Sequence, residues 1–203
     1  EFTTKEVFYN LVNSQKEKVR ENMTFGTFIW LLSPILASIG CEHTQSDQFF
    51  PENNMLPLHL RFPLEAEFID TKLLVTNAHH NKQVPLGSSI KSINGVPITK
   101  IIDEVFKHIP TNGHSKALKK AVFNRFITSY VSYYLNFPET YEVTLEGRDQ
   151  SIKLSSLESF ELGFTSREKE LDFELVAEGS IAKLRIRNFN FYGGKRWEKY
   201  TSF

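Results

Sequence analysis

The sequence contains very little cysteine. Cys41 is the only cysteine among 203 residues, so no disulfide can form within the chain. A lone cysteine leaves the redox compartment open. The six histidines are scattered along the chain, and with one cysteine they lack the four-ligand spacing of a structural zinc site. We therefore expect no metal and no other cofactor.

An excess of charge of one sign is also missing. Lysine and arginine together number 24, aspartate and glutamate also number 24, and the formal net charge is zero. Proteins that bind nucleic acid need a clustered basic excess to neutralise phosphates. No lysine and arginine run of that density is present, so the composition excludes nucleic acid as a main partner.

Long hydrophobic runs are absent as well. The longest apolar stretch, residues 28–39, is interrupted by Ser33, Pro34 and Ser38 and is too short to span a bilayer. No signal peptide is visible at Glu1. Membrane association is therefore expected only through a leader that the sequence does not include.

The first 50 residues carry the periodicity of helices. Apolar residues in 5–21 are spaced for one helical face, and Thr24 is suited to cap a second helix that extends to residue 39. Pro34 should kink that second helix, because it lacks a backbone donor, and Gly40 should end it. We expect these two helices to form an antiparallel hairpin.

The next hundred residues alternate between strand and helix patterns. Residues 56–62 and 66–78 alternate as strands do, and the second of these runs turns near Asp70. Asn94 and Gly95 supply the positive φ angles of a tight turn between two further short strands. Thr99 is suited to cap a following helix, and a longer helix should begin near Ser115.

Two more hairpins complete the chain. Residues 140–157 alternate around a turn at Gly147, and residues 170–189 alternate around a turn at Glu178 and Gly179. A polar linker at 158–169 separates them. The last hairpin and the incipient helix after it are too small to build a core of their own.

The segment "INGVPI", followed by an apolar helix, resembles a PDZ-like module in the circularly permuted form found in bacterial proteases. The order of motifs extends the resemblance: "ILASIGCEHTQ" ends the helical segment, the PDZ-like unit follows, and "AKLRIRNFNF" comes last. This succession resembles the N-terminal half of the C-terminal-processing (tail-specific, tricorn-related) serine peptidases. It covers nearly the whole chain, although each motif is short.

The resemblance implies an α+β chain in three parts. Residues 1–50 would be an N-terminal helical segment, 51–157 a PDZ-like domain with leading strands, and 158–203 the start of a peptidase core. The family's nucleophilic serine lies beyond the end of this sequence, so the chain alone is not expected to cleave peptides. The resemblance also implies proteolysis outside the cytoplasm, in the periplasm or cell envelope, and oligomerisation through the core.

His43 is the candidate catalytic residue that the resemblance provides. Here "CEHT" stands where family members often have "GHT", with Glu42 in place of the glycine. In the tricorn-related branch a histidine at this place is the general base, which would take a proton from the serine of the core. The alternative is a histidine that caps the preceding helix or simply lies on the surface.

The predicted peptide-binding residues are Leu86, Gly87, Ser88 and Ile90. The resemblance implies that the loop from Pro85 uses its backbone N–H groups to hold the carboxylate of a peptide or protein C-terminus. The strand that contains Ile90 would then accept the peptide as an additional strand. The alternative is an ordinary turn between two elements.

Two functions remain open at this stage. One is the N-terminal and PDZ-like part of a serine peptidase, a hydrolase, that binds C-termini by strand addition. The other is a non-catalytic PDZ-like module for peptide binding or scaffolding. Two side-chain groups have simpler interpretations: we expect Phe123, Phe126 and Tyr130 to pack in the core, and Lys116 and Lys119 to form a solvated face.

Overall fold

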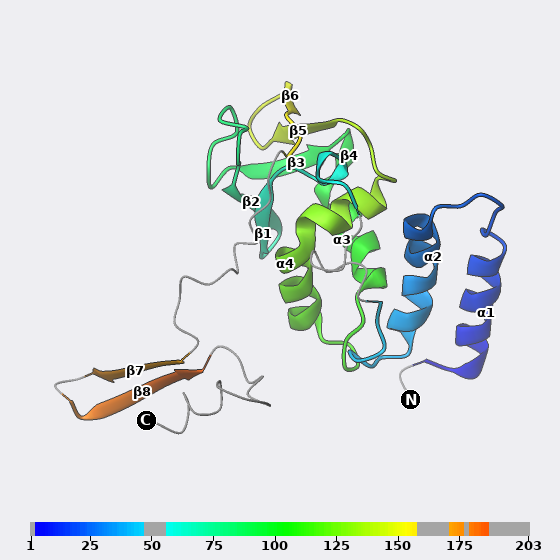
Figure 1. Ribbon diagram of the computed structural model, residues 1–203, viewed down its shortest axis with the longest axis horizontal. Helices are drawn as coiled ribbons and strands as arrows, with labels where there is room; N and C mark the ends of the chain where they lie inside the picture. The colour runs from blue at the N-terminus through cyan, green and yellow to red at the C-terminus, as the bar shows by residue number, and fades with distance from the viewer. Residues whose placement is uncertain (1–2, 47–55, 158–170, 177–178, 187–203) are drawn as a thin grey trace. The chain divides into compact units, whose positions relative to one another are not determined.

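The computed structural model describes residues 3–46, 56–157, 171–176 and 179–186 (Figure 1). The fold is mixed α and β, with helices and antiparallel sheets, as predicted. The chain divides into two compact units, Glu1–Phe160 and Glu161–Phe203. Each unit is described by itself.

Two helices form the N-terminal hairpin. Helix α1 spans Lys5–Lys16 and helix α2 spans Phe25–Ser38, and they pack side by side in opposite directions (Figure 1). Thr24 caps α2 as predicted, since its side chain accepts a hydrogen bond from the Thr27 amide at 3.2 Å. Helix α1 ends before residue 21, because the residues that follow are mostly charged and are exposed, with no apolar face to bury.

Pro34 lies inside α2 and changes the hydrogen bonding of the helix. A proline at this position cannot donate to the carbonyl of Trp30, four residues earlier. The Ser33 hydroxyl donates to that carbonyl instead, at 2.9 Å. The helix therefore continues through the proline with a side chain in place of a backbone donor.

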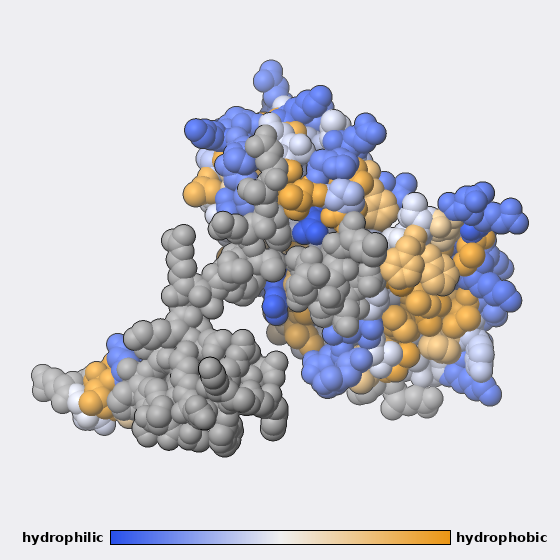
Figure 2. Space-filling model, viewed as in Figure 1, coloured by the Kyte–Doolittle hydropathy of each residue, from blue (hydrophilic) through white to orange (hydrophobic). Residues whose placement is uncertain are grey.

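The hairpin leaves apolar side chains on its surface. Val7 is 57% exposed, Phe25 58% and Phe28 42%. Figure 2 shows hydrophobic surface gathered over α1 and α2. Among the described residues, nothing covers this face.

The prediction of a strand at residues 56–62 is wrong. Leu58–Leu60 form a short 3-10 helix, η2, that lies between Pro57 and Pro63. The Phe62 amide donates to the Thr128 carbonyl at 3.0 Å, so this segment pairs with a helix rather than with the sheet. The prolines explain the difference, because each removes a backbone donor that a strand would need.

The main sheet is antiparallel, with the order β1-β2-β3-β5-β6 and with β4 paired to β3. Its strands are β1 (Glu65–Ile69), β2 (Lys72–Asn77), β3 (Ser89–Ile93), β4 (Val96–Pro97), β5 (Tyr141–Leu145) and β6 (Ser151–Leu154). The predicted hairpins at Asp70, Asn94 and Gly147 are all present. Asn94 and Gly95 adopt φ angles of 47° and 75°, as the tight turn requires.

Two helices pack against the sheet. Helix α3 spans Ile98–Val105 and passes into a 3-10 turn, η3, at Phe106–His108. Thr99 is not its cap, because the helix already begins at Ile98, with Pro97 in the capping position. Helix α4 spans Lys116–Tyr134 and is capped by Ser115, as predicted, with non-helical angles at Phe126.

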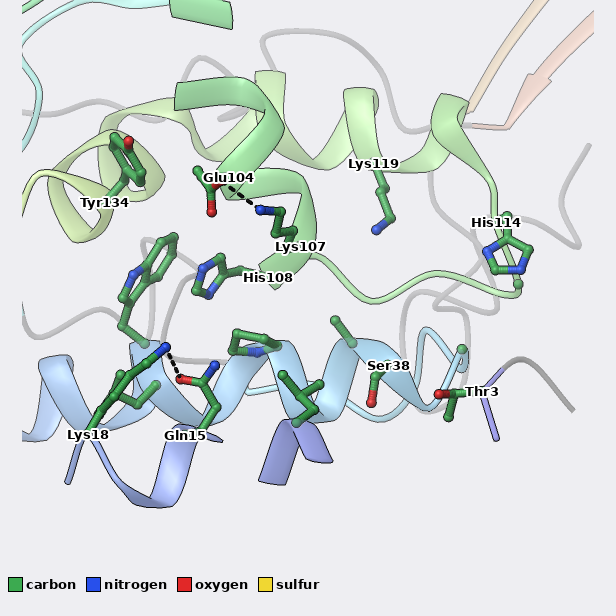
Figure 3. Close-up of a pocket in the computed structure, with 17 residues that line it drawn as sticks. Thr3, Gln15, Lys18, Ser38, Glu104, Lys107, His108, His114, Lys119 and Tyr134 are labelled. Carbon is green, nitrogen blue, oxygen red and sulfur yellow. Dashed lines mark hydrogen bonds and ion pairs between the residues drawn. The ribbon is translucent and has the colours of Figure 1, made fainter. Parts of the chain in front are cut away.

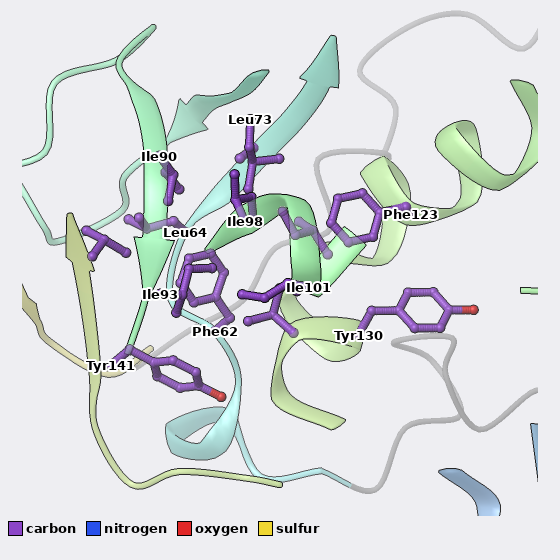
Figure 4. Packing of buried hydrophobic residues seen from close by; sticks show 14 of the residues in the cluster. Phe62, Leu64, Leu73, Ile90, Ile93, Ile98, Ile101, Phe123, Tyr130 and Tyr141 are labelled. Atoms are coloured by element: carbon purple, nitrogen blue, oxygen red, sulfur yellow. The ribbon is translucent and has the colours of Figure 1, made fainter. Parts of the chain in front are cut away.

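The core lies between the sheet and α3 and α4 (Figure 4). Its fully buried members come from many parts of the chain and include Phe62, Leu64, Leu73, Ile90, Ile93, Ile101, Ile109, Phe123, Ile127 and Tyr130. The aromatic residues of α4 belong to this core, as expected: Phe123, Phe126 and Tyr130 are all buried. This packing fixes α4 alongside β1.

The second unit contains one described hairpin, β7 (Leu171–Val176) paired with β8 (Ile181–Ile186). This hairpin confirms the expectation for residues 170–189 in the part that is described. Glu178 in its turn, the predicted linker and the helix after residue 189 lie outside the described residues.

Candidate functional site

The loop before β3 uses its amides within the chain. Gly87 donates its N–H to the Val75 carbonyl at 2.8 Å. The Ser88 amide and hydroxyl both point back to the Pro85 carbonyl, at 3.2 and 2.6 Å. Leu86 projects outward and is 68% exposed. The loop is thus a hydrogen-bonded turn, and the amides of Gly87 and Ser88 are not available to a carboxylate.

The sequence predicted that the strand after this loop, β3, has a free edge for a peptide. In the structure neither edge of β3 is free. Strand β3 is an interior strand, paired with β2 through Ile90 and Leu73 and with β5 through Ile90 and Leu145. The Ile90 side chain is fully buried. No guest strand can pair with β3 while this sheet is intact, because both of its edges are occupied. Sequence periodicity could not show this, since it gives a strand's faces but not its neighbours.

The first strand of the sheet, β1, has helix α4 along its outer side. There the Phe68 amide donates to Oδ1 of Asn124 at 2.8 Å, and Nδ2 of Asn124 lies 3.5 Å from the Phe68 carbonyl. A side-chain carboxamide offers one acceptor and a donor, as a peptide group does. Asn124 therefore pairs with β1 in the place where a peptide group of another strand would pair.

The two halves of the β1 border differ in how they are closed. Just before β1 begins, the Phe62 amide donates to the backbone of α4 and to the Ser132 hydroxyl, and Ala66 in the first half of the strand is 1% exposed. At the C-terminal half, Phe68 is only partly buried, and the Nζ atom of Lys120 lies 5.7 Å from the centre of its ring. The C-terminal half is therefore closed by side chains alone.

The last strand, β6, is continued by a similar side-chain pairing. Asn81 accepts from the Ser155 amide at 2.7 Å and donates to the Ser155 carbonyl at 3.2 Å. Asn81 is 1% exposed, whereas Asn124 is partly exposed. Opening the β6 end would uncover a buried amide, whereas Asn124 is partly exposed and belongs to α4, the helix that packs along β1.

His43 lies exposed in the turn after α2. This turn is held by the Asn112 carboxamide, which accepts from the Glu42 amide at 3.1 Å, and by the Gly113 amide, which donates to the Gly40 carbonyl at 3.1 Å. The His43 amide, followed by the Thr44 hydroxyl and the His43 ring, lowers the pKa of the adjacent Cys41 thiol.

A buried serine and histidine meet elsewhere, between α2 and η3. Ser33 Oγ and His108 Nδ1 are 2.7 Å apart, and the Trp30 ring stacks on the His108 ring with centroids 3.4 Å apart. Burial lowers the pKa of His108 to about 3. Because Ser33 is 2% exposed and donates to the Trp30 carbonyl, no substrate can reach it. The pair joins the helical hairpin to the part of the first unit that contains the sheet, α3 and α4. No pattern in the sequence predicts a contact between Ser33 and His108, which lie far apart in the chain.

Two further findings concern the described residues. They contain no group of three histidine, cysteine, aspartate or glutamate side chains placed to hold a metal ion. Within the same residues, no helix combines the length and the apolar composition that crossing a membrane requires.

Comparison with known proteins adds no relative. No protein-family model matches the chain, and no curated protein is similar to it in sequence. The assignment of function therefore depends on the geometry and on the motifs in the sequence.

Proposed function

We propose that this chain is the N-terminal and PDZ-like portion of a serine peptidase that resembles the tail-specific proteases. In this proposal the PDZ-like module binds an extended peptide or protein C-terminus by strand addition. The strand that accepts the peptide is β1, at Phe68, and not β3. The observation that carries the proposal is the pairing of Asn124 with both polar groups of the Phe68 backbone.

The borders of the sheet favour β1 over β3. Of the strands that sequence analysis considered, β3 is paired on both sides, so strand addition there has no free border. At Phe68 the partner is the Asn124 side chain of α4, so a peptide that adds there must replace its two hydrogen bonds and move α4 away from β1. Lys120, beside the Phe68 ring, places a positive charge where a terminal carboxylate would add a favourable interaction.

Peptide titration of the full chain tests this function. Peptides with apolar C-terminal residues are added as free acids or as C-terminal amides, and backbone amide signals are followed by NMR. We expect the Phe68 signal to move with saturation, and amidation to weaken binding by about tenfold, because one charge-assisted contact is lost. Binding that leaves Phe68 unperturbed, or no binding at all, would contradict strand addition at β1.

A scaffolding module is the second candidate, and a specific observation favours it. The described ends of both outer strands are occupied by asparagine side chains, Asn124 at β1 and Asn81 beyond β6. Proteins protect strand edges in this way against unwanted pairing. If neither the native chain nor the Asn124→Ala variant binds any peptide, scaffolding is the better description.

His43 carries the catalytic part of the proposal. In a protein that joins this chain to a peptidase core, His43 would serve as general base, and its replacement by alanine should lower kcat by at least about a hundredfold. His80→Ala is a suitable control, because His80 is also exposed but lies in a different loop. An unchanged peptidase rate in the His43→Ala variant would exclude the catalytic role.

A further inference from the structure

A cavity of about 670 Å³ lies between the helical hairpin and the helices α3 and α4 that pack on the sheet (Figure 3). One wall comes from α1 and α2 and the other from α3, η3 and both ends of α4. All of these elements belong to the first compact unit. The volume is within the range of pockets that hold small organic molecules.

Positive charge dominates the polar part of the lining. Lys18, Lys107 and Lys119 line the cavity, with Glu104 as the only carboxylate among its lining residues. Glu104 is already paired, since its Oε1 atom lies 2.6 Å from Nζ of Lys107. Among the described residues, Lys18 and Lys119 form no ion pair, so the walls carry two positive charges without counter-ions.

Lys119 is the best placed of these cations. Its Nζ atom donates to the Phe106 carbonyl at 2.6 Å, which fixes the ammonium group at the cavity wall. The side chain is partly buried, and this burial lowers the pKa of Lys119. Removing an ammonium from water without a counter-ion costs free energy, and a bound anion would offset that cost. The expectation that Lys119 belongs to a solvated face is therefore wrong.

Part of the remaining lining is apolar. Trp30, Leu31 and Pro34 of α2 contribute to it, and Tyr134 lies on the opposite wall (Figure 3). Trp30 is held in place by its stack on His108, whose Nδ1 atom is in turn bonded to Ser33. A ligand for this cavity should therefore combine an apolar body with an acidic group.

We propose that this cavity binds a small aromatic or apolar carboxylate, with the carboxylate at Lys119 and the apolar body against α2. The site is separate from the β1 border, and its occupancy does not depend on peptide binding. A ligand here contacts the hairpin and the sheet unit together, so it should also stabilise their association.

Benzoate is a suitable probe for the full chain, with benzamide as its neutral isostere and inorganic phosphate as an anion without an apolar body. Binding is measured by calorimetry, and the site is located by the NMR signal of the Trp30 indole. We expect benzoate to bind with one-to-one stoichiometry and to move the Trp30 signal. Benzamide and phosphate should each bind about tenfold more weakly, because each lacks one of the two interactions.

Three variants test the site. Lys119→Met should weaken benzoate binding by about tenfold, whereas Lys116→Met, an exposed lysine of the same helix outside the lining, should leave it unchanged. Glu104→Gln removes the only carboxylate of the lining and should strengthen binding, an effect that a purely structural role of Lys119 would not produce. Thermal unfolding of each variant shows that it is folded.

The opposite results would overturn the proposal. Equal binding of benzoate and benzamide would show that the charge of the ligand does not contribute to binding. Equal binding of benzoate and phosphate would show that contact with the apolar wall does not contribute. Equal effects of Lys119→Met and Lys116→Met would mean that Lys119 only caps the Phe106 carbonyl. Weaker benzoate binding in Glu104→Gln would also contradict an anion site.

Discussion

At the edges of this sheet, asparagine carboxamides form the hydrogen bonds that the peptide groups of another strand would form. The two asparagines differ in burial. Asn124 is partly exposed, while Asn81 is 1% exposed. Hydrogen bonds that reach solvent contribute little to stability, but buried polar groups that lose their partners are costly. The same side chain can therefore be a replaceable partner at β1 and a structural one beyond β6.

The Asn124→Ala and Asn81→Ala variants should separate these roles. Asn124→Ala should speed hydrogen exchange at the Phe68 amide and raise peptide affinity by about 2- to 10-fold, because no side chain has to be displaced. Asn81→Ala should lower the free energy of unfolding by about 1–3 kcal/mol, because the Ser155 backbone loses its buried partner. If Asn124→Ala lowered stability as much as Asn81→Ala and left peptide affinity unchanged, Asn124 would be a structural clamp.

The buried His108 makes stability depend on pH. Burial lowers its pKa in the folded protein from the ordinary histidine value of 6.5 to about 3. The unfolded chain binds a proton below pH 6.5, whereas the folded protein does so only near pH 3. Stability from this group is therefore complete above pH 6.5 and is lost as the pH falls toward 3. The slope approaches about 1.4 kcal/mol per pH unit.

Denaturant unfolding between pH 4 and pH 7 measures this slope. In the His108→Phe variant, which keeps an aromatic ring against Trp30, the contribution of His108 should disappear. His80→Ala should keep it, because His80 is exposed. A slope that is the same in the native chain and in His108→Phe would show that the pKa of His108 is the same in the folded and the unfolded state.

At the scale of elements, Ser132 of α4 connects three segments. Its hydroxyl accepts from the Phe62 amide at 2.9 Å and from the Tyr141 hydroxyl at 2.9 Å, and it donates to the Thr128 carbonyl at 2.7 Å. It is completely buried. Side chains that enter the hydrogen-bond ladder of a helix accompany bends, and α4 has its non-helical angles nearby, at Phe126.

The Ser132→Ala variant should therefore lower the free energy of unfolding by about 2 kcal/mol, because buried donors lose a partner. Tyr141→Phe should cost less, because Phe retains the ring in the core. In a double-mutant cycle the two changes should couple, since the hydroxyls are in contact. Ser151→Ala, at an exposed serine, is the control. Strict additivity of Ser132→Ala and Tyr141→Phe would show that the hydroxyl contact contributes nothing.

The elements show which parts of the structure the sequence could predict. Strands with a turn of fixed chemistry, such as the one at Asn94 and Gly95, were predicted with their partners, because the turn determines the pairing. Residues 56–62 alternate like a strand, but they include Pro57, are followed by Pro63 and bind to α4, a tertiary contact that periodicity does not contain. The order of strands is also invisible to periodicity, and for that reason the peptide site was expected at β3.

At the scale of the whole molecule, the part of the buried core that the structure describes lies within one compact unit. Every buried hydrophobic residue that the structure describes falls between Ile29 and Leu157. In the described hairpin of the other unit, Leu175, Ile181 and Leu184 are more than half exposed, at 59%, 55% and 54%. Two-stranded hairpins are marginally stable by themselves in water. The first unit should therefore fold without the second, but not the reverse.

Truncation tests this independence. A chain of residues 1–160 should unfold cooperatively with a Tm within about 2 °C of that of the full chain, because it keeps every described core residue. A chain that ends at residue 147 should be much less stable, because it loses β6 and the buried Leu154 and Leu157. The isolated segment 161–203 should show no cooperative transition by circular dichroism. A fall of about 10 °C or more in the Tm of residues 1–160 would mean that the second unit stabilises the first.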